Sequence, residues 1–174
     1  MNAQLHHINA THPEAALLET EQQALAVAQE LAAHFAATAS QRDSERLLPF
    51  AEMDALALSG LLAITVPEDY GGLDVSNATL AEITAILAQA DGSLGQIPQN
   101  HFYILEALRI DGSEDQKRYF FSRALAGDRF GNALSERGTK TVGHHNTRIT
   151  RDGPGYRING RKFYSTGVLF ADWV

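Results

Sequence analysis

His101 is the residue whose type and position most clearly suggest chemistry. It lies in the segment Ser93–Tyr103, near the start of an otherwise apolar stretch that predicts a helix over 94–110. A helix N-terminus lowers the pKa of an imidazole and attracts anions, which suits a group that gives or takes a proton. The alternative is a core histidine whose ring nitrogens are both hydrogen-bonded. This segment taken alone favours that alternative.

A second candidate is the polar segment that follows Phe130. Residues 130–134 predict a short strand, and Asn132, Ser135 and Thr139 add side-chain donors around it. Backbone N–H groups at the end of a strand can hold the polar edge of a planar ligand. An ordinary strand-to-turn transition explains these residues equally well.

A third candidate is the triplet Tyr164-Ser165-Thr166. We predict a hairpin whose strands are 156–158 and 162–166, because Asn159-Gly160 is a strong signal for a tight turn. Alternation along the second strand would place Tyr164 and Thr166 on one face and Ser165 on the other. One face could then pack on an aromatic ring while a hydroxyl group donates to the edge of that ring.

Several other chemistries are disfavoured. The pairs His6-His7 and His144-His145 are adjacent rather than four residues apart, so neither suits a helical zinc site, and we expect no metal. The absence of cysteine excludes a disulfide framework and thiol chemistry, and it fits the cytoplasm. A net charge of −7 argues against binding to nucleic acid. We see no signal peptide and no apolar run long enough to span a membrane, so we predict a cytoplasmic protein that does not contact membranes.

The elements that must position these residues are helices first and strands later. The apolar spacing predicts helices over 13–41, 49–60, 76–90, 94–110 and 113–125, with residues 42–46 as a polar connector. Ser76 or Asn77 should cap the third helix, and Ser113 with Gln116 predicts a capping box. Extended segments are predicted at 130–134, 146–150, 156–158 and 162–166. This order indicates an α+β fold rather than alternating βαβ units.

Several segments together resemble the acyl-CoA dehydrogenase family of flavoproteins. The segment Leu61–Gly72 is similar to that family's loop after the second helix, and Asp91–Gly95 to its interhelix turn. Residues 133–136 (Ala-Leu-Ser-Glu) resemble its flavin loop, and residues 159–172 keep the spacing of its Asn-Gly-x-Lys strand and the Ala-Asp that follows. The resemblance covers nearly the whole chain.

The resemblance implies a domain organisation and a set of flavin contacts. Residues 1–128 would form the N-terminal helical domain, and residues 129–174 would form the start of a middle β-barrel domain, which is incomplete here. A separate C-terminal four-helix domain would be absent from this chain. The flavin ring would lie against two segments of the middle domain. The residues implied to bind it are Asn132, Ala133, Leu134, Ser135, Arg137, Tyr164, Ser165 and Thr166.

Departures from the family pattern point to one of its branches. Ser135 replaces a threonine, Arg137 a proline, Ser165 a branched aliphatic residue, and Gly167 an asparagine or serine. A hydroxyl group beside the flavin, together with His101, resembles the monooxygenases of dibenzothiophene and sulfur-acquisition type. These use oxygen and reduced FMN supplied by a separate reductase.

That resemblance implies roles for individual residues. His101 would act as acid, base or donor, and Ser165, with Asn132, would donate to the flavin edge or to the oxygen bound there. Tyr164 would pack on the ring, the N–H groups around Leu134 and Ser135 would hold its pyrimidine edge, and Tyr103 would line the substrate pocket.

Two other functions stay open at this point. One is an FAD-dependent acyl-CoA dehydrogenase, whose catalytic carboxylate would come from residues beyond this chain. The other is a truncated, non-catalytic helical domain. The full-length protein is expected to form a homo-oligomer, a tetramer, that acts on a small molecule. This chain alone is expected to be inactive.

Overall fold

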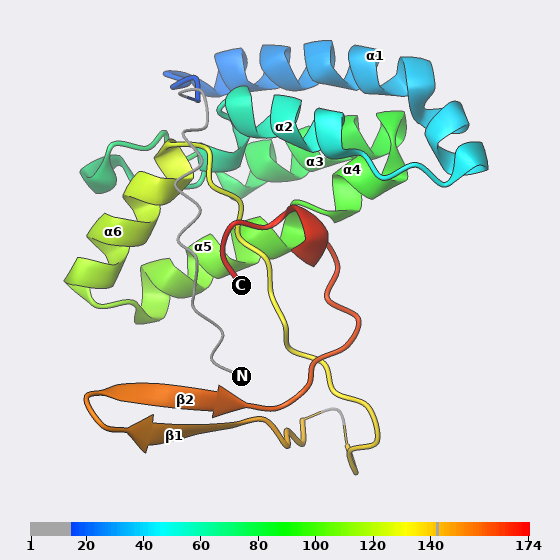
Figure 1. Ribbon diagram of the computed structural model, residues 1–174. Helices are drawn as coiled ribbons and strands as arrows, with labels where there is room; N and C mark the ends of the chain where they lie inside the picture. The colour runs from blue at the N-terminus through cyan, green and yellow to red at the C-terminus, as the bar shows by residue number, and fades with distance from the viewer. Residues whose placement is uncertain (1–14, 142) are drawn as a thin grey trace.

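The computed structural model describes residues 15–141 and 143–174, and it is mostly helical with one small sheet (Figure 1). The α-helices are α1 (Glu21–Glu45), α2 (Phe50–Leu58), α3 (Asn77–Ala90), α4 (Gly92–Gln96), α5 (Gln99–Asp111) and α6 (Glu114–Leu125), and the strands are β1 (Arg148–Asp152) and β2 (Gly155–Asn159). Helices therefore precede strands, which confirms the predicted α+β order. Within the described ranges, every helix is too short or too polar to cross a membrane.

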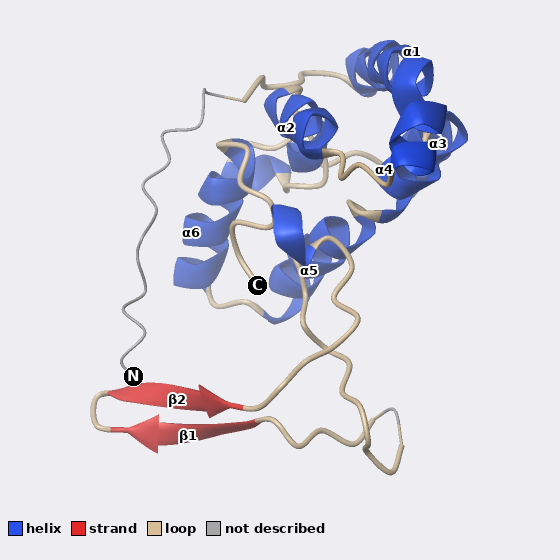
Figure 2. Cartoon of the chain, turned by 45° about the vertical axis from the view of Figure 1, so that its right-hand side comes forward, coloured by secondary structure: helices blue, strands red, loops and turns tan. Residues whose placement is uncertain are grey.

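The helices enclose two adjoining apolar clusters. The first lies between α1, α2, α3 and α4, and it includes Phe35, Leu56, Ile83 and Leu94. The second lies between α5 and α6 and includes Phe121. The hairpin of β1 and β2 projects away from both clusters (Figures 1 and 2). The packed helical part is therefore the rigid support for the segments that connect to the hairpin.

Helix α1 begins later and ends later than the sequence predicts. It begins after Thr20, whose hydroxyl accepts from the N–H of Gln23 at 3.1 Å, so the predicted start near residue 13 is wrong. Pro13 itself lies outside the described residues. The helix continues to Glu45 because Arg42, predicted in a connector, is buried and forms ion pairs at 2.7 Å with Glu52 and with Asp91.

Local signals identify the ends of the other helices well. Ser76 caps α3, the capping box of Ser113 and Gln116 is present at α6, and Gly60 follows α2 with a φ of 84°.

The single predicted helix 94–110 is wrong. Asp91 caps the short α4, and α5 begins only after Pro98, which has no N–H to continue a helical ladder.

The predicted hairpin is wrong in its turn and in its second strand. β1 pairs antiparallel with β2, with Ile149 opposite Ile158, and the turn between them is Gly153-Pro154. Gly153 has a φ of 62°, as the first position of a type II′ turn requires. Residues 160–165 form no strand pairing, and Tyr164 has a φ of 58°, so the predicted alternation of faces in 162–166 does not apply.

Candidate functional site

The two segments implied to contact a flavin lie side by side, although they are far apart in the sequence (Figure 1). The N–H of Phe163 donates to the carbonyl of Ser135 at 2.9 Å. The ammonium group of Lys162 donates to the carbonyl of Leu134 at 3.0 Å. We call residues 132–137 the first loop and residues 161–166 the second loop. The structure thus brings together the two halves of the predicted cofactor set.

Glu136, the last residue of the segment that resembles the family's flavin loop, holds the two loops in this arrangement, a role that the sequence did not predict. Its carboxylate accepts from the N–H of Asn146 at 2.6 Å, from the N–H and hydroxyl of Thr147 at 2.9 and 2.6 Å, and from Lys162 at 2.9 Å. Only 4% of the side chain is exposed. These bonds, that of the Thr147 hydroxyl first, hold the pKa of Glu136 far below its usual range. The residue is therefore a charged clamp on the site.

The first loop contains backbone N–H groups that have no partner within the described part of the chain. The N–H groups of Asn132, Ala133, Leu134 and Ser135 form no hydrogen bond with any described residue. The Leu134 side chain is 59% exposed. A surface that presents unpaired N–H groups beside an apolar side chain suits the polar edge of a flat ligand.

The second loop adds an aromatic group and hydroxyl groups. Tyr164 is 77% exposed, and within the described ranges the Ser165 hydroxyl forms no hydrogen bond. The guanidinium carbons of Arg137 and Arg161 lie 5.5 and 5.8 Å from the centre of the Phe163 ring. Stacking of a guanidinium group on an aromatic face stabilises the arrangement of both loops.

His101 lies in the core next to these loops. Because the N–H of Phe130 can only donate, Nδ1 accepts from it at 3.1 Å, and Nε2–H donates to the carbonyl of Leu62 at 2.7 Å. Burial lowers the pKa of His101 to about 4, so the ring is neutral near pH 7. The cavity beside it measures about 10 Å³. This geometry matches the core-histidine alternative raised by the sequence.

Asn100 is a second residue that the sequence analysis did not select. Its Nδ2 donates to the carbonyl of Thr166 at 2.8 Å, and its Oδ1 accepts from Nδ2 of Asn132 at 2.6 Å. One buried amide on α5 thus joins the first loop to the second. No signal in the sequence distinguishes it from other polar residues in a first helical turn.

Tyr103 is not brought to the loops by any contact. It lies two residues after His101, about 200° around α5, and its side chain is 55% exposed. Its assignment to a substrate pocket stays a prediction.

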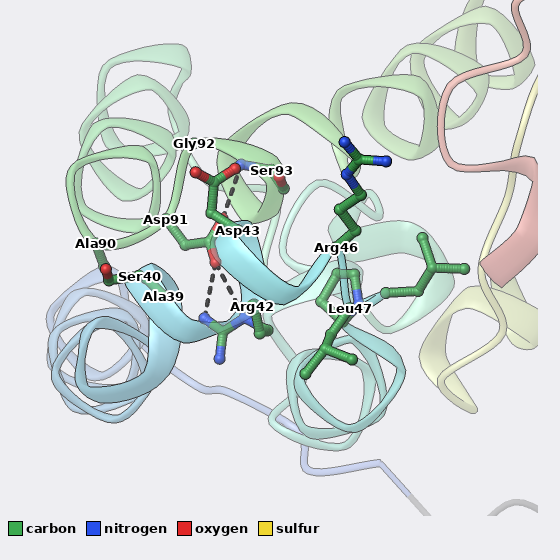
Figure 3. Close-up of a pocket in the computed structure, with 12 residues that line it drawn as sticks. Ala39, Ser40, Arg42, Asp43, Arg46, Leu47, Ala90, Asp91, Gly92 and Ser93 are labelled. Atoms are coloured by element: carbon green, nitrogen blue, oxygen red, sulfur yellow. Dashed lines mark hydrogen bonds and ion pairs between the residues drawn. The ribbon is translucent and has the colours of Figure 1, made fainter.

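A cleft of about 740 Å³ lies elsewhere, between the end of α1 and the start of α4 (Figure 3). The ion pair of Arg42 with Asp91 forms part of its wall, and none of the predicted site residues lines it. Across the described residues, no three metal-ligating side chains lie close enough to hold an ion. The pair His6-His7, which the sequence disfavours as a zinc site, lies outside those residues.

Comparison with known proteins gives a consistent family. The model of the acyl-CoA dehydrogenase N-terminal domain matches residues 19–128. Dibenzothiophene monooxygenase of Rhodococcus qingshengii is 32% identical over 149 residues, which are 85% of this chain and 36% of that protein. The probable FMNH2-dependent monooxygenase SfnC of Pseudomonas putida is 37% identical over 123 residues, which are 70% of this chain and 31% of that protein.

Among solved structures, FMN-bound TdsC from Paenibacillus sp. A11-2 aligns with a TM-score of 0.77 and 36% identity, covering 86% of this chain and 38% of TdsC. The chain spans about a third of the length of the curated relatives it matches. The residues matched by the family model include the described α-helices α1 to α6. The chain belongs to the acyl-CoA dehydrogenase family and carries its N-terminal domain.

Proposed function

We propose that the protein of which this chain is part is a monooxygenase that uses reduced FMN and acts on small organosulfur compounds. The observation that carries the proposal is the juxtaposition of the two loops, which brings the loop with unpaired backbone N–H groups against the loop that carries Ser165. It is supported by relatives described as a dibenzothiophene monooxygenase and as a probable FMNH2-dependent monooxygenase.

The residues present fit a flavin. The N–H groups of residues 132–135 have no partner among the described residues, and they would face the carbonyl-rich pyrimidine edge of the ring. The exposed side chains of Leu134 and Tyr164 would cover its faces. Arg137 would add positive charge at the edge of the site. When bound in its reduced form, the flavin would supply electrons that activate oxygen, one atom of which goes to sulfur and the other to water.

The chain's own residues would then bind, orient and exclude water. In this proposal Ser165 donates its hydroxyl hydrogen toward the reacting oxygen, Thr166 completes the second loop, and Glu136 keeps the loops together. His101 holds Phe130 through Nδ1, so we assign it a positioning role in this conformation. Its predicted role as an acid or base would require one of the two ring nitrogens to leave its backbone partner.

Oxygen uncoupling tests the role of Ser165. In the protein encoded by the complete reading frame, with a flavin reductase supplied, Ser165→Ala should release about tenfold more hydrogen peroxide per flavin oxidised, because a donor to the reacting oxygen is lost. The measurement is peroxide formed against flavin oxidised in the presence of a sulfone or thiophene substrate.

The matched control is Ser40→Ala, which removes an exposed hydroxyl group far from the loops on α1. It should keep the wild-type ratio. Equal peroxide release from Ser165→Ala and from the control would remove the proposed role of the hydroxyl group.

The alternative functions give different results in simple assays. An FAD-dependent acyl-CoA dehydrogenase would reduce an electron-accepting dye with acyl-CoA, whereas the proposed enzyme would support growth on a sulfone as the sole sulfur source. A non-catalytic helical domain would bind neither FMN nor FAD in a titration. The flavin reductase, the tetramer and the location in the cytoplasm stay part of the proposal.

A further inference from the structure

The amides of Asn100 and Asn132 form a hydrogen-bonded relay with a fixed direction. The carbonyl of Thr166 can only accept, so the Asn100 atom 2.8 Å from it must be the nitrogen. The Asn100 oxygen must then face Asn132 and accept from its nitrogen at 2.6 Å. The two amides therefore cannot be rotated independently.

The direction of the relay decides what Asn132 presents to a ligand. One hydrogen of its Nδ2 is committed to Asn100, which leaves the second Nδ2–H and the oxygen Oδ1, and neither forms a hydrogen bond with any described residue. Asn132 is only partly buried, so part of its surface is open to a bound molecule. The groups of Asn132 that remain for a ligand thus include an acceptor, Oδ1, beside the donor that the sequence predicts at this position.

The relay is anchored on a rigid element. Asn100 is 7% exposed and lies in the first turn of α5, next to His101, which holds the N–H of Phe130. Neighbouring side chains of one helix therefore fix both residue 130 and residue 132. A group held by a packed helix keeps its orientation at lower entropic cost than a group on a free loop.

We infer that Asn100 is a positioning residue that fixes the Asn132 amide so that Oδ1 accepts a hydrogen bond from an N–H of the bound flavin ring. The inference rests on the proposed function. With N1 deprotonated, as in the anionic reduced form, a flavin ring offers two such donors: N3–H, which is present in both redox states, and N5–H, which is present only when the ring is reduced.

Measuring flavin affinity tests the inference directly and does not require an activity assay. In the protein encoded by the complete reading frame, Kd would be measured for oxidised FMN, for 3-methyl-FMN and, without oxygen, for reduced FMN. The variants are Asn100→Leu, Asn132→Leu and the double variant. The matched control is Gln99→Leu, which makes the same change from amide to leucine at the exposed neighbouring position. Thermal unfolding followed by circular dichroism confirms that each variant is folded.

Each single variant should weaken FMN binding by about threefold to tenfold, as expected for the loss of one uncharged hydrogen bond. Because Asn100 acts through Asn132, the double variant should bind no more weakly than Asn132→Leu, whereas independent structural effects would add. The control should bind like the wild type. If Asn100→Leu does not fold, Asn132→Leu tests the same contact from the loop side.

The probes distinguish the two flavin donors. If the oxygen accepts from N3–H, 3-methyl-FMN binds weakly to the wild type and the variants weaken it no further. If it accepts from N5–H, the loss appears with reduced FMN alone. Variants that bind all three probes like the wild type, or losses that add in the double variant, would overturn the inference. Failure of the wild type to bind any FMN would instead overturn the proposed function, and with it the ligand assigned to Asn132.

Discussion

At the scale of single residues, His101 has a structural role: from the first turn of α5 it forms hydrogen bonds with the backbone of two other segments. Both ring nitrogens are used by backbone groups of other segments, Leu62 and Phe130, so the imidazole replaces two backbone hydrogen bonds that these segments cannot make. The bonds require the neutral ring with the proton on Nε2. The sequence could place His101 near a helix start, but only the fold shows which backbone groups surround it.

The lowered pKa of His101 predicts a loss of stability in mild acid. Its pKa is about 4 in the folded chain, whereas the unfolded chain has the ordinary value of 6.5. Between these two pH values the unfolded chain therefore binds more protons than the folded chain. The contribution is complete above pH 6.5 and is lost as the pH falls toward 4. One pKa unit corresponds to about 1.4 kcal/mol, so the total is about 3 kcal/mol, of which about 2 kcal/mol disappears between pH 7 and pH 5.

Urea unfolding at pH 7 and at pH 5 measures this effect. His101→Gln should be less stable than the wild type at pH 7 but should lose about 2 kcal/mol less between the two pH values. His34→Gln is the control, because it removes an exposed histidine of α1 and leaves both contacts of His101 intact. An equal pH dependence for His101→Gln and the wild type would show that the ring is not held neutral.

At the scale of elements, the charged clamp of Glu136 joins the two loops to the start of β1. Glu136→Gln should speed amide hydrogen exchange at Phe163, whose N–H is bonded to Ser135, and should leave exchange in α1 and α3 unchanged. The reason is that the neutral amide loses the attraction of Lys162 and presents one oxygen where the carboxylate presents two. Glu30→Gln, an exposed change on α1, is the control and should exchange like the wild type.

Acid should imitate this substitution. The folded pKa of Glu136 is depressed, so its stabilising effect is present above the ordinary value of 4.5 and is lost as the pH falls below that value. After correction for the intrinsic pH dependence of exchange, the protection of Phe163 in the wild type should fall toward that of Glu136→Gln below about pH 4.5. Protection that stays constant down to pH 3 would contradict the clamp.

Elements with local signals could be predicted, and elements fixed by distant contacts could not. Ser76 and Ser113 cap their helices through hydrogen bonds within three residues, so the sequence contains the whole signal. Arg42 belongs to α1 because Asp91, 49 residues away, neutralises it. The Asn159-Gly160 signal failed because Asn159 pairs with Arg148 as the last residue of β2. Gly160 instead allows a close approach to Thr147, because a Cβ atom there would lie 2.1 Å from the Thr147 hydroxyl.

The same contrast separates the two parts of the candidate site. The residues Asn132 to Ser135 and Arg137 are predicted as flavin contacts, and this stays a prediction. Asn100 and Glu136, which orient the loops, were not predicted, because their partners Asn132 and Lys162 lie 32 and 26 residues away in the sequence. The orientation of the side chains in a site depends on such distant contacts, and these cannot be predicted from the composition of the local sequence.

At the scale of the whole molecule, the final segment is packed onto the helices although the hairpin before it is not. Phe170 is 6% exposed and lies in the first apolar cluster, 4.8 Å from the ring of Phe50. Trp173 stacks on Phe130 at 6.5 Å and donates from its indole N–H to Asp128 at 2.7 Å. We therefore expect this segment and the helices to unfold as one cooperative unit.

Trp173 makes this expectation measurable, because it is the only tryptophan of the chain. Unfolding of the chain in urea should give the same midpoint by tryptophan fluorescence, which follows the final segment, and by circular dichroism, which follows the helices. Phe170→Ala should lower the free energy of unfolding by about 3 kcal/mol, since it removes a buried aromatic ring. Both midpoints should therefore move together to a lower urea concentration. Leu169→Ala changes a neighbour that is 68% exposed and should move neither midpoint.

A fluorescence transition that precedes the loss of helix, in the wild type or in Phe170→Ala alone, would mean that the final segment is only loosely attached. The second loop, which connects that segment to the hairpin, would then lack the rigid support that the proposed flavin site requires.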